Sequence, residues 1–309
     1  REYIEKSNGK KRPLGIPTVL DRIIQECVRI IIEPICEARF YPQSYGFRPY
    51  RAQKHAIRGI INVINAGCKS PDQPVWAIEG DIKGCFDNIN HRLLLQKLWR
   101  IGIHDKRVLK IISQMLKAGY MENDLFHATE LGTPQGGILS PLLSNIVLNE
   151  LDWWITSQWV GMPTRHEYSG KIHENGTKDQ SKKYRELRKT NLKECYIVRY
   201  ADDFKIFCRK HSDAVKLFEA TRAWLKERLG LDISPEKSKI VNLKHAYSDF
   251  LGFRIKVHKG KRNQYVVISH IAPKALDKIK ESAKEKVKAI QHSSGEMEEF
   301  KVVNDYNSF

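Results

Sequence analysis

Short apolar runs of strand length are interspersed along the chain with longer segments of helical spacing. The clearest strands are residues 74–82 and 195–200, and two aspartates separate the second from another apolar run at 204–209. Shorter strands are predicted near residues 231–234, 240–243, 250–257 and 265–269. Because strands and helices do not follow each other in regular βαβ units, the pattern predicts an α+β fold with an antiparallel sheet.

The predicted helices differ in how clearly their ends are marked. Residues 90–102 and 105–119 each close on a glycine, which suits the C-terminal end of a helix. A later helix is expected to have Ser140 as its N-cap and Pro141 as its first helical residue. An early helix is expected to begin near Asp21 and to end before Pro34. Its predicted buried side chains are Ile23, Ile24, Cys27, Val28 and Ile31.

Two segments are distinguished by their basic residues. Residues 164–194 are polar and basic without a sustained apolar period, which indicates an inserted loop. After Pro273 a basic amphipathic helix is predicted, with an apolar stripe between Leu276 and Ile290 and lysines around the other side.

The charge of the whole chain narrows the class of partner. Its 309 residues carry 53 Lys and Arg against 36 Asp and Glu, a net charge of +17. Such an excess favours a polyanionic partner, with nucleic acid first and an anionic membrane surface second. The longest apolar stretch, residues 23–35, contains Arg29 and Glu33, so a membrane span is not expected.

The cysteines indicate a reducing environment. None of the six forms a C-x-x-C pair, so a zinc site is not expected. Most lie in apolar surroundings, where a reduced cysteine behaves as a small hydrophobic residue. We therefore expect free thiols and a cytoplasmic location.

Three aspartates stand at the ends of predicted strands. Asp81 ends the strand at 74–82, while Asp202 and Asp203 form the tip of the hairpin at 195–209. An Asp-Asp pair by itself is most often a solvated turn. Here the flanking strands are apolar and a third aspartate ends another strand, so neighbouring strands would bring the carboxylates together. Mg²⁺ would then offset their repulsion, and two such ions suit phosphoryl transfer.

The sequence around these aspartates resembles a known family. The motif "YADD" at 200–203 is similar to the catalytic box of reverse transcriptases, and further blocks follow in the order of that family. They are "RPLGIP" (12–17), "QSYGFRP" (43–49), "GDIKGCFDNINH" (80–91), "GTPQGGILSPLLSNIVLNELD" (132–152), "LGLDISPEKSKI" (229–240) and "FLGF" (250–253). Their wording resembles the reverse transcriptase/maturase proteins encoded by group II introns.

The resemblance implies a right-hand polymerase fold, with an antiparallel palm sheet and helical fingers. The expected divisions are fingers at 1–75, a first part of the palm at 76–99, a fingers/palm connection at 100–140, the palm with its basic insertion 164–194 at 141–270, and the start of an incomplete thumb at 271–309. The family carries more sequence at both ends, so this chain is expected to be truncated.

The resemblance also implies roles for individual residues. Asp81, Asp202 and Asp203 match the catalytic carboxylates that bind two Mg²⁺ ions, and the carbonyl of Ile82 adds a ligand. For nucleotide binding, Phe86 matches the position that crowds the sugar 2′ carbon. The other nucleotide-binding matches are Gln135, at the incoming base pair, and Lys6 and Arg12, at the triphosphate.

Further positions are implied less directly. Lys237 and Lys239 are alternative general acids for the leaving pyrophosphate, and a surface role is open for either. Tyr200 and Ala201 are expected beneath the primer end. Lys274 and Lys278 are expected to follow a nucleic-acid backbone, although a solvated charged face explains the same pattern.

The predicted function is RNA-directed DNA synthesis from dNTPs on a primer, with intron RNA binding that supports splicing and retromobility. One alternative is an RNA-binding splicing cofactor without polymerase activity, and another is a different reverse transcriptase class. The basic insertion at 164–194 is a candidate intron-RNA contact. Apolar surface at the incomplete thumb leaves a homodimer open.

Overall fold

The structure of the chain is a computed structural model with an α+β fold. It describes residues 2–5, 11–65, 73–122, 125–133, 136–168, 170–172, 179–260, 265–293, 301 and 303. Every helix in these ranges is too short or too polar to cross a membrane.

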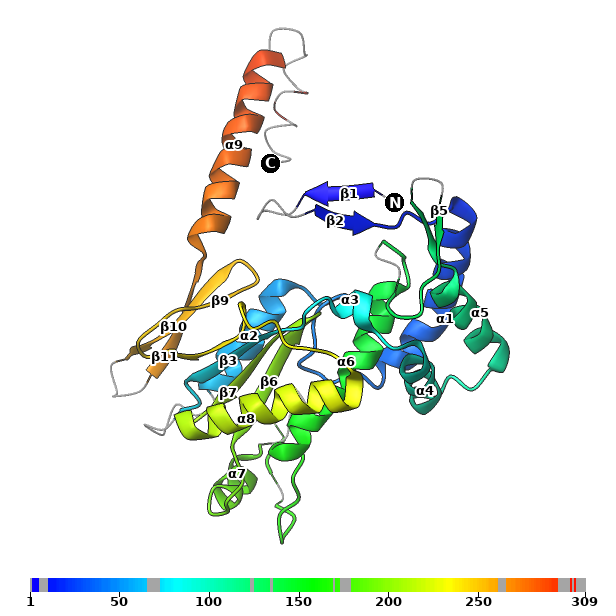
Figure 1. Cartoon of the computed structure of the whole chain (residues 1–309). Helices are drawn as coiled ribbons and strands as arrows, with labels where there is room; N and C mark the ends of the chain where they lie inside the picture. The colour runs from blue at the N-terminus through cyan, green and yellow to red at the C-terminus, as the bar shows by residue number, and fades with distance from the viewer. Residues whose placement is uncertain are drawn as a thin grey trace.

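A four-stranded antiparallel sheet lies at the centre of the molecule (Figure 1). Its strands run in the order β6 (Cys195–Tyr200), β7 (Asp203–Cys208), β3 (Trp76–Asp81) and β8 (Lys239–Asn242). β6 and β7 form the predicted hairpin, and β3 enters beside β7 from far earlier in the sequence. The strand predicted at 231–234 is reduced to an isolated bridge between Ile82 and Ile233.

The two faces of this sheet bury separate cores, because successive side chains of a strand point to opposite faces. Ile78, Phe204 and Ile206 belong to the larger core, with α6 (Ser140–Gln158), α8 (His211–Trp224) and the π-helix Leu225–Leu229. Ala77 and Phe207 belong to a second core, with α2 (Gln53–Asn65) and a three-stranded sheet. The outer sheet consists of β9 (Ser248–Phe250), β10 (Phe253–Lys259) and β11 (Tyr265–Ile271).

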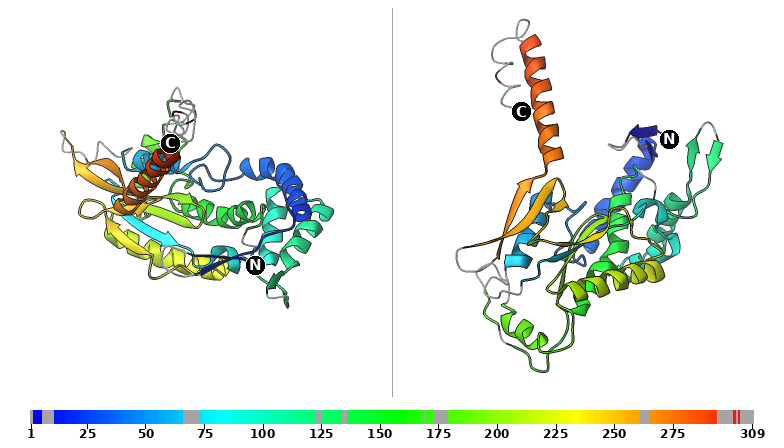
Figure 2. Two further views of the ribbon diagram at one scale, coloured as in Figure 1. Left: turned by 90° about the horizontal axis from the view of Figure 1, so that it is seen from above. Right: turned by 60° about the vertical axis from the view of Figure 1, so that its left-hand side comes forward.

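The remaining elements lie at opposite ends of the central sheet (Figure 2). At one end are α1 (Val19–Glu37), α4 (His91–Ile101), α5 (Lys106–Lys117) and the hairpin of β4 (Tyr120–Glu122) and β5 (Leu125–His127). At the other end α9 (Pro273–Ser293) rises from the outer sheet. The hairpin of β1 (Glu2–Glu5) and β2 (Lys11–Leu14) lies between them in Figure 1.

The helix around Pro34 departs from its prediction in length and in orientation. α1 runs through Pro34 to Glu37, and its buried residues are Gln25, Val28, Ile32 and Cys36. Of the predicted set only Val28 is buried, whereas Ile23 and Ile31 are 55% and 63% exposed. The prediction was wrong because the apolar face of α1 is broad and only its edge around Val28 and Ile32 is packed, so periodicity alone did not identify the buried residues.

Smaller differences have local causes. Leu139, not Ser140, is the N-cap of α6, so Pro141 is the second residue of the helix and not the first as predicted. The insertion at 164–194 contains a short helix, α7 (Ser181–Leu187), whose Leu187 is buried. The strand predicted at 250–257 is two strands, because Leu251 and Gly252 adopt positive φ angles of 54° and 80° and turn the chain.

Candidate active site

Asp81 and Asp203 are direct partners across the two central strands. The antiparallel register of β3 and β7 pairs their Cα atoms at the strand ends. Residues opposed in this way have Cβ atoms about 5 Å apart, so two like charges there repel each other. Glu79 and Lys205 are the next opposed pair on the same face, two residues further into the sheet.

The tip of the β6–β7 hairpin places Asp202 beside this pair. Ala201 begins the turn at a φ of 56°, and the carbonyl of Asp202 accepts a hydrogen bond from the Ile82 amide at 3.3 Å. Asp203 follows at once as the first residue of β7. The hairpin is therefore hydrogen-bonded to the chain that leaves Asp81, and the three predicted aspartates lie at one edge of the sheet.

Burial and neighbouring charge change the proton affinity of this group. Burial, with the carboxylates of Asp81 and Asp202 nearby, raises the pKa of Asp203 to about 6 from its ordinary 3.8, against the opposing effect of Lys205 and Lys237. A cation close to such a carboxyl group would stabilise its ionised form.

Lys237 forms an ion pair with the first of the three aspartates. Its Nζ lies 3.0 and 2.9 Å from the two carboxylate oxygens of Asp81, and this hydrogen bonding raises the pKa of Lys237. Lys239 on β8 is opposite Glu79, and its Nζ lies 3.8 Å from Oε2 of that residue. Of the two predicted general acids, Lys237 is thus the one at the carboxylates.

The donor set suits a hard divalent cation, although the carboxylates are not yet gathered around one point. Aspartate oxygens are the ligands that Mg²⁺ prefers. The pKa of Asp203 is raised chiefly by burial, and a bound cation would offset this cost to the ionised form. Over the ranges given above, no three His, Cys, Asp or Glu side chains already form a metal-binding cluster. Asp81 faces Lys237 instead, so binding a cation requires Asp81 to exchange this partner.

Comparison with known proteins identifies the family. A family model described as reverse transcriptase (RNA-dependent DNA polymerase) matches residues 4–255. The chain belongs to the reverse transcriptase family. It is 37% identical over 275 residues to Protein YkfC of Escherichia coli K12. The match covers 88% of this chain and 70% of YkfC.

Other relatives confirm the resemblance to intron-encoded proteins. This reverse transcriptase is 39% identical over 290 residues to the group II intron-encoded protein LtrA of Lactococcus lactis subsp. cremoris. The match covers 84% of this chain and 47% of LtrA, so the chain spans about half the length of that relative.

Solved structures confirm the right-hand polymerase fold. A Candida tropicalis telomerase, in complex with a TWJ fragment of telomeric RNA, superposes with a TM-score of 0.55 at 15% identity and covers 82% of this chain and 43% of that one. An apo telomerase from the same organism, truncated from its C-terminal domain, gives a TM-score of 0.51 at 17% identity. This match covers 75% of this chain and 43% of the telomerase chain.

The predicted nucleotide-binding residues are described to different extents. Phe86 lies in α3 (Cys85–Asn88), packs edge-to-face on Phe47 with ring centroids 6.1 Å apart, and accepts a hydrogen bond at its carbonyl from the Thr133 amide. Arg12 lies in β2. Lys6 and Gln135 lie outside the described residues.

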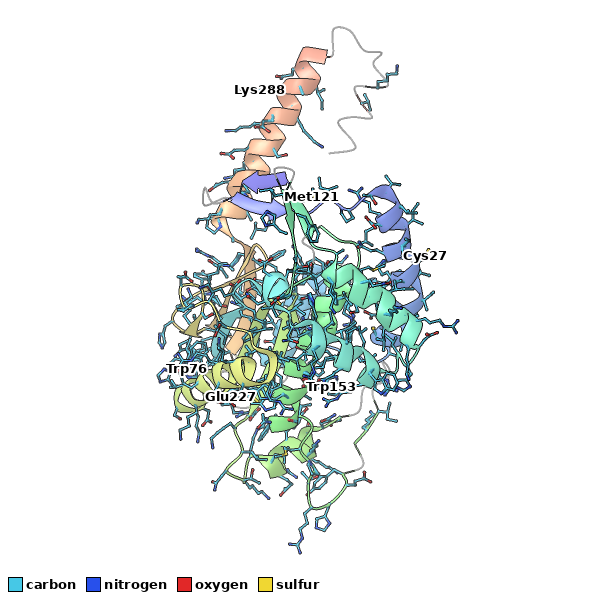
Figure 3. The ribbon with its side chains drawn as sticks, turned by 45° about the vertical axis from the view of Figure 1, so that its right-hand side comes forward. Cys27, Trp76, Met121, Trp153, Glu227 and Lys288 are labelled. Carbon is cyan, nitrogen blue, oxygen red and sulfur yellow. The ribbon has the colours of Figure 1, made fainter. Side chains whose placement is uncertain are left out.

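The predicted nucleic-acid contacts fall in two places. Tyr200 is half-buried against the second core and Ala201 is 6% exposed, both at the acidic hairpin. Lys274 and Lys278 are exposed on α9. Figure 3 labels Lys288 further along this helix, well away from the central sheet. The predicted contacts therefore lie on two different elements, the acidic hairpin and α9.

Two pairs of charged side chains are buried near the aspartates, and none of these residues was a predicted site residue. Arg199 and Asp152 form an ion pair with fully buried side chains, and Lys205 pairs with Glu79 at 3.0 Å. A signal was present: Arg199 is a charge within an apolar strand, and Asp152 is a charge within a largely apolar helix. Such charges seldom stay buried unless they are paired.

Proposed function

We propose that this reverse transcriptase catalyses RNA-directed addition of dNTPs to a primer 3′-OH. The observation that carries the proposal is the cross-strand pairing of Asp81 with Asp203, next to Asp202 at the hairpin tip. Three carboxylates at one edge of a sheet suit two divalent cations, for which we propose Mg²⁺ with the Ile82 carbonyl as a further ligand.

The chain's own groups would position the reactants. Bound Mg²⁺ would activate the attacking oxygen and stabilise charge on the leaving one. Asp203, with a pKa of about 6, is largely ionised at neutral pH and available as a ligand. Lys237 is our candidate to leave Asp81 and give a proton to the pyrophosphate, because its raised pKa keeps it protonated until then. Lys239 is the alternative.

We assign the remaining residues by their matches to the family motifs. Phe86, beside the exposed ring of Phe47, would crowd the sugar 2′ position. Gln135 would contact the incoming nucleotide, and Lys6 and Arg12 would hold its triphosphate. Nucleic-acid contacts are proposed at Tyr200, Ala201, Lys274 and Lys278.

The domain divisions support the same proposal. We propose residues 1–75 as fingers, 76–99 and 141–270 as palm, 100–140 as their connection and 271–309 as the start of a thumb. The central sheet and its aspartates then lie in the palm, with α1 at the fingers end and α9 at the thumb end (Figure 1).

We further propose that the partner includes intron RNA. The proposal is supported by the net charge of +17 and by relatives named as group II intron-encoded protein LtrA and as nuclear intron maturase 2 of Arabidopsis thaliana, the latter 29% identical over 178 residues. Binding to intron RNA and to a generic duplex, compared at rising salt, tests it. A preference for the intron that persists at high salt is expected, because non-specific phosphate contacts weaken there.

Two other properties are proposed from less direct observations. Cys27, Cys36, Cys85, Cys195 and Cys208 are free thiols, which supports a reducing compartment such as the cytoplasm. The exposed apolar side chains of α1 and α9 support a homodimer, which sedimentation velocity tests.

Primer extension on an RNA template with dNTPs and Mg²⁺ tests the catalytic proposal. The double variant Asp202→Asn/Asp203→Asn is expected to lose extension completely while the wild type extends. Asp105→Asn is the matched control, because Asp105 caps α5 on the surface and asparagine caps a helix equally well. Extension by the double variant at the wild-type rate would reject the proposed metal site.

A further inference from the structure

Arg199 lies in β6, immediately before the segment that carries the aspartates, and its side chain is fully buried. Its partner Asp152 in α6 is fully buried too, with 2.7 Å between Nη2 and Oδ2. A buried ion pair contributes little stability by itself, because the cost of desolvating both charges offsets their attraction. We therefore consider how this pair orients the Arg199 guanidinium and the groups around it.

All five N–H groups of the Arg199 guanidinium have acceptors. Nε donates to Asp152 Oδ1 at 2.9 Å, and Nη2 donates to Asp152 Oδ2 at 2.7 Å. Nη1 donates to Asn145 Oδ1 at 3.0 Å and to the carbonyl of Ala201 at 2.7 Å, and Nη2 also donates to Ser44 Oγ at 2.8 Å. A lysine has the same charge but cannot reproduce this planar set of donors.

The Ala201 contact connects this network to the turn of the acidic hairpin. Ala201 has a φ of 56°, which costs a non-glycine residue energy, so surrounding contacts must hold it there. Its carbonyl is the acceptor for Arg199, and the next two residues are Asp202 and Asp203. The network thus acts on the backbone from which both carboxylates project.

The segment at 43–46 supports the hairpin from the same side. The Arg199 amide donates to the Gln43 carbonyl at 3.0 Å, and the Tyr45 amide donates to the Arg199 carbonyl at 2.9 Å. Asn145 donates to the Gly46 carbonyl at 2.7 Å. α6, this segment and the hairpin therefore meet at one guanidinium.

We propose that Arg199 is a positioning residue that fixes the acidic hairpin so that Asp202 and Asp203 can bind divalent cations together with Asp81. The proposal rests on the proposed function. Residues that orient metal ligands typically change metal affinity or activity about 10- to 100-fold when altered.

The test compares Arg199→Lys with Arg188→Lys. Arg188 pairs with Glu194 at the opposite end of β6 and provides the same chemical change away from the aspartates. Mn²⁺ binding is measured by electron paramagnetic resonance, and hydrogen exchange reports on the amides of residues 200–203. Steady-state kinetics separate kcat from KM for dNTP.

For Arg199→Lys we expect about tenfold weaker Mn²⁺ binding, about tenfold lower kcat, little change in KM and faster exchange at 200–203. Arg188→Lys is expected to match the wild type in all four measurements. Asn145→Ala keeps the ion pair but removes one acceptor of Arg199 and the donor to the Gly46 carbonyl, so it supplies the same test, with smaller shifts, if Arg199→Lys does not fold.

The outcomes separate the two proposals. If the folded variants bind Mn²⁺ and exchange amides like the wild type, the positioning role is wrong even though the polymerase proposal stands. If the wild type neither binds Mn²⁺ nor extends a primer, the proposed function is wrong. Even if the proposed function is wrong, the positioning role is still tested by hydrogen exchange. Unchanged amide exchange at residues 200–203 in Arg199→Lys would overturn it.

Discussion

Lys205 and Glu79 form a buried ion pair two residues along the strands from Asp203 and Asp81, on the same face of the sheet, with 3.0 Å between Nζ and Oε1. Ser248 donates a hydrogen bond to the same Glu79 oxygen, and Lys205 donates one to the carbonyl of Asp249 at 2.8 Å. The pair therefore joins β9 of the outer sheet to the two strands that carry the aspartates.

Replacing one partner of this pair should destabilise the protein strongly. In Lys205→Met, Glu79 stays only 10% exposed, with Lys239 as a more distant cation at 3.8 Å. A buried charge without its partner costs about 3–5 kcal/mol, so urea unfolding should show a loss of that order. Lys205→Met combined with Glu79→Leu should recover most of it. A loss below about 1 kcal/mol in the single variant would contradict this reasoning.

The raised pKa of Asp203 makes stability depend on pH. Because the folded protein holds this proton up to about pH 6 and the unfolded chain releases it near 3.8, the group's contribution is fully present below pH 4 and is lost as pH rises through 6. In EDTA, wild-type stability should fall relative to Asp203→Asn by up to about 3 kcal/mol between pH 4 and 7.

Urea unfolding at several pH values measures this difference. Asp105→Asn is the control, because it makes the same chemical change at an exposed carboxylate outside the site. Parallel stability curves for the wild type and Asp203→Asn would show that Asp203 titrates normally.

Gly46 lies against the acidic hairpin too closely for any side chain. A Cβ at this position would lie 2.3 Å from the Ala201 nitrogen and 2.9 Å from the Tyr200 carbonyl carbon, both backbone atoms. Gly46→Ala must therefore move the hairpin, and we expect at least a tenfold loss of primer extension. In Gly161→Ala the nearest contact is 3.3 Å, so this control should retain activity. Full activity in Gly46→Ala would show that the hairpin tolerates displacement.

The sequence predicted the acidic site because its signals are local. Asp81 ends β3 and Asp203 begins β7, with Asp202 in the turn before it, and antiparallel pairing brings the end of one strand beside the start of the next. The register that opposes Asp81 to Asp203 was not predictable, since it depends on which strands become neighbours. The Arg199–Asp152 pair joins residues 47 positions apart and likewise depends on how α6 packs on β6.

The error in α1 has a different physical origin. Periodicity identifies the apolar face of a helix but not how much of it is covered, and the broad apolar face of α1 leaves isoleucines exposed at 23, 24, 30, 31 and 35. Pro34 was expected to end the helix, although a proline removes only one hydrogen bond and α1 continues past it to Glu37.

Burial should protect most of the described thiols from alkylation. It raises the pKa of Cys36 and of Cys85 to about 12, whereas Cys27 is exposed on α1, as Figure 3 shows. At pH 8 only about 1 in 10⁴ of a thiol with pKa 12 is ionised, and the thiolate is the reactive form. Iodoacetamide with peptide-resolved mass spectrometry should modify Cys27 first, and equally fast modification of Cys85 would contradict the buried position.

Removing charge from α9 should weaken nucleic-acid binding without changing its sequence preference. Lys274 and Lys278 lie one turn apart on the exposed helix, so both can approach phosphates of one duplex. In Lys274→Gln/Lys278→Gln, the slope of log K against log salt for an RNA–DNA duplex should decrease by up to about 2, since each phosphate contact contributes about 0.9. Lys106→Gln/Lys110→Gln, which removes two exposed charges from α5, should keep the wild-type slope. Equal slopes for the wild type and the α9 variant would remove these lysines from the binding surface and leave their charge as a solvated helix face.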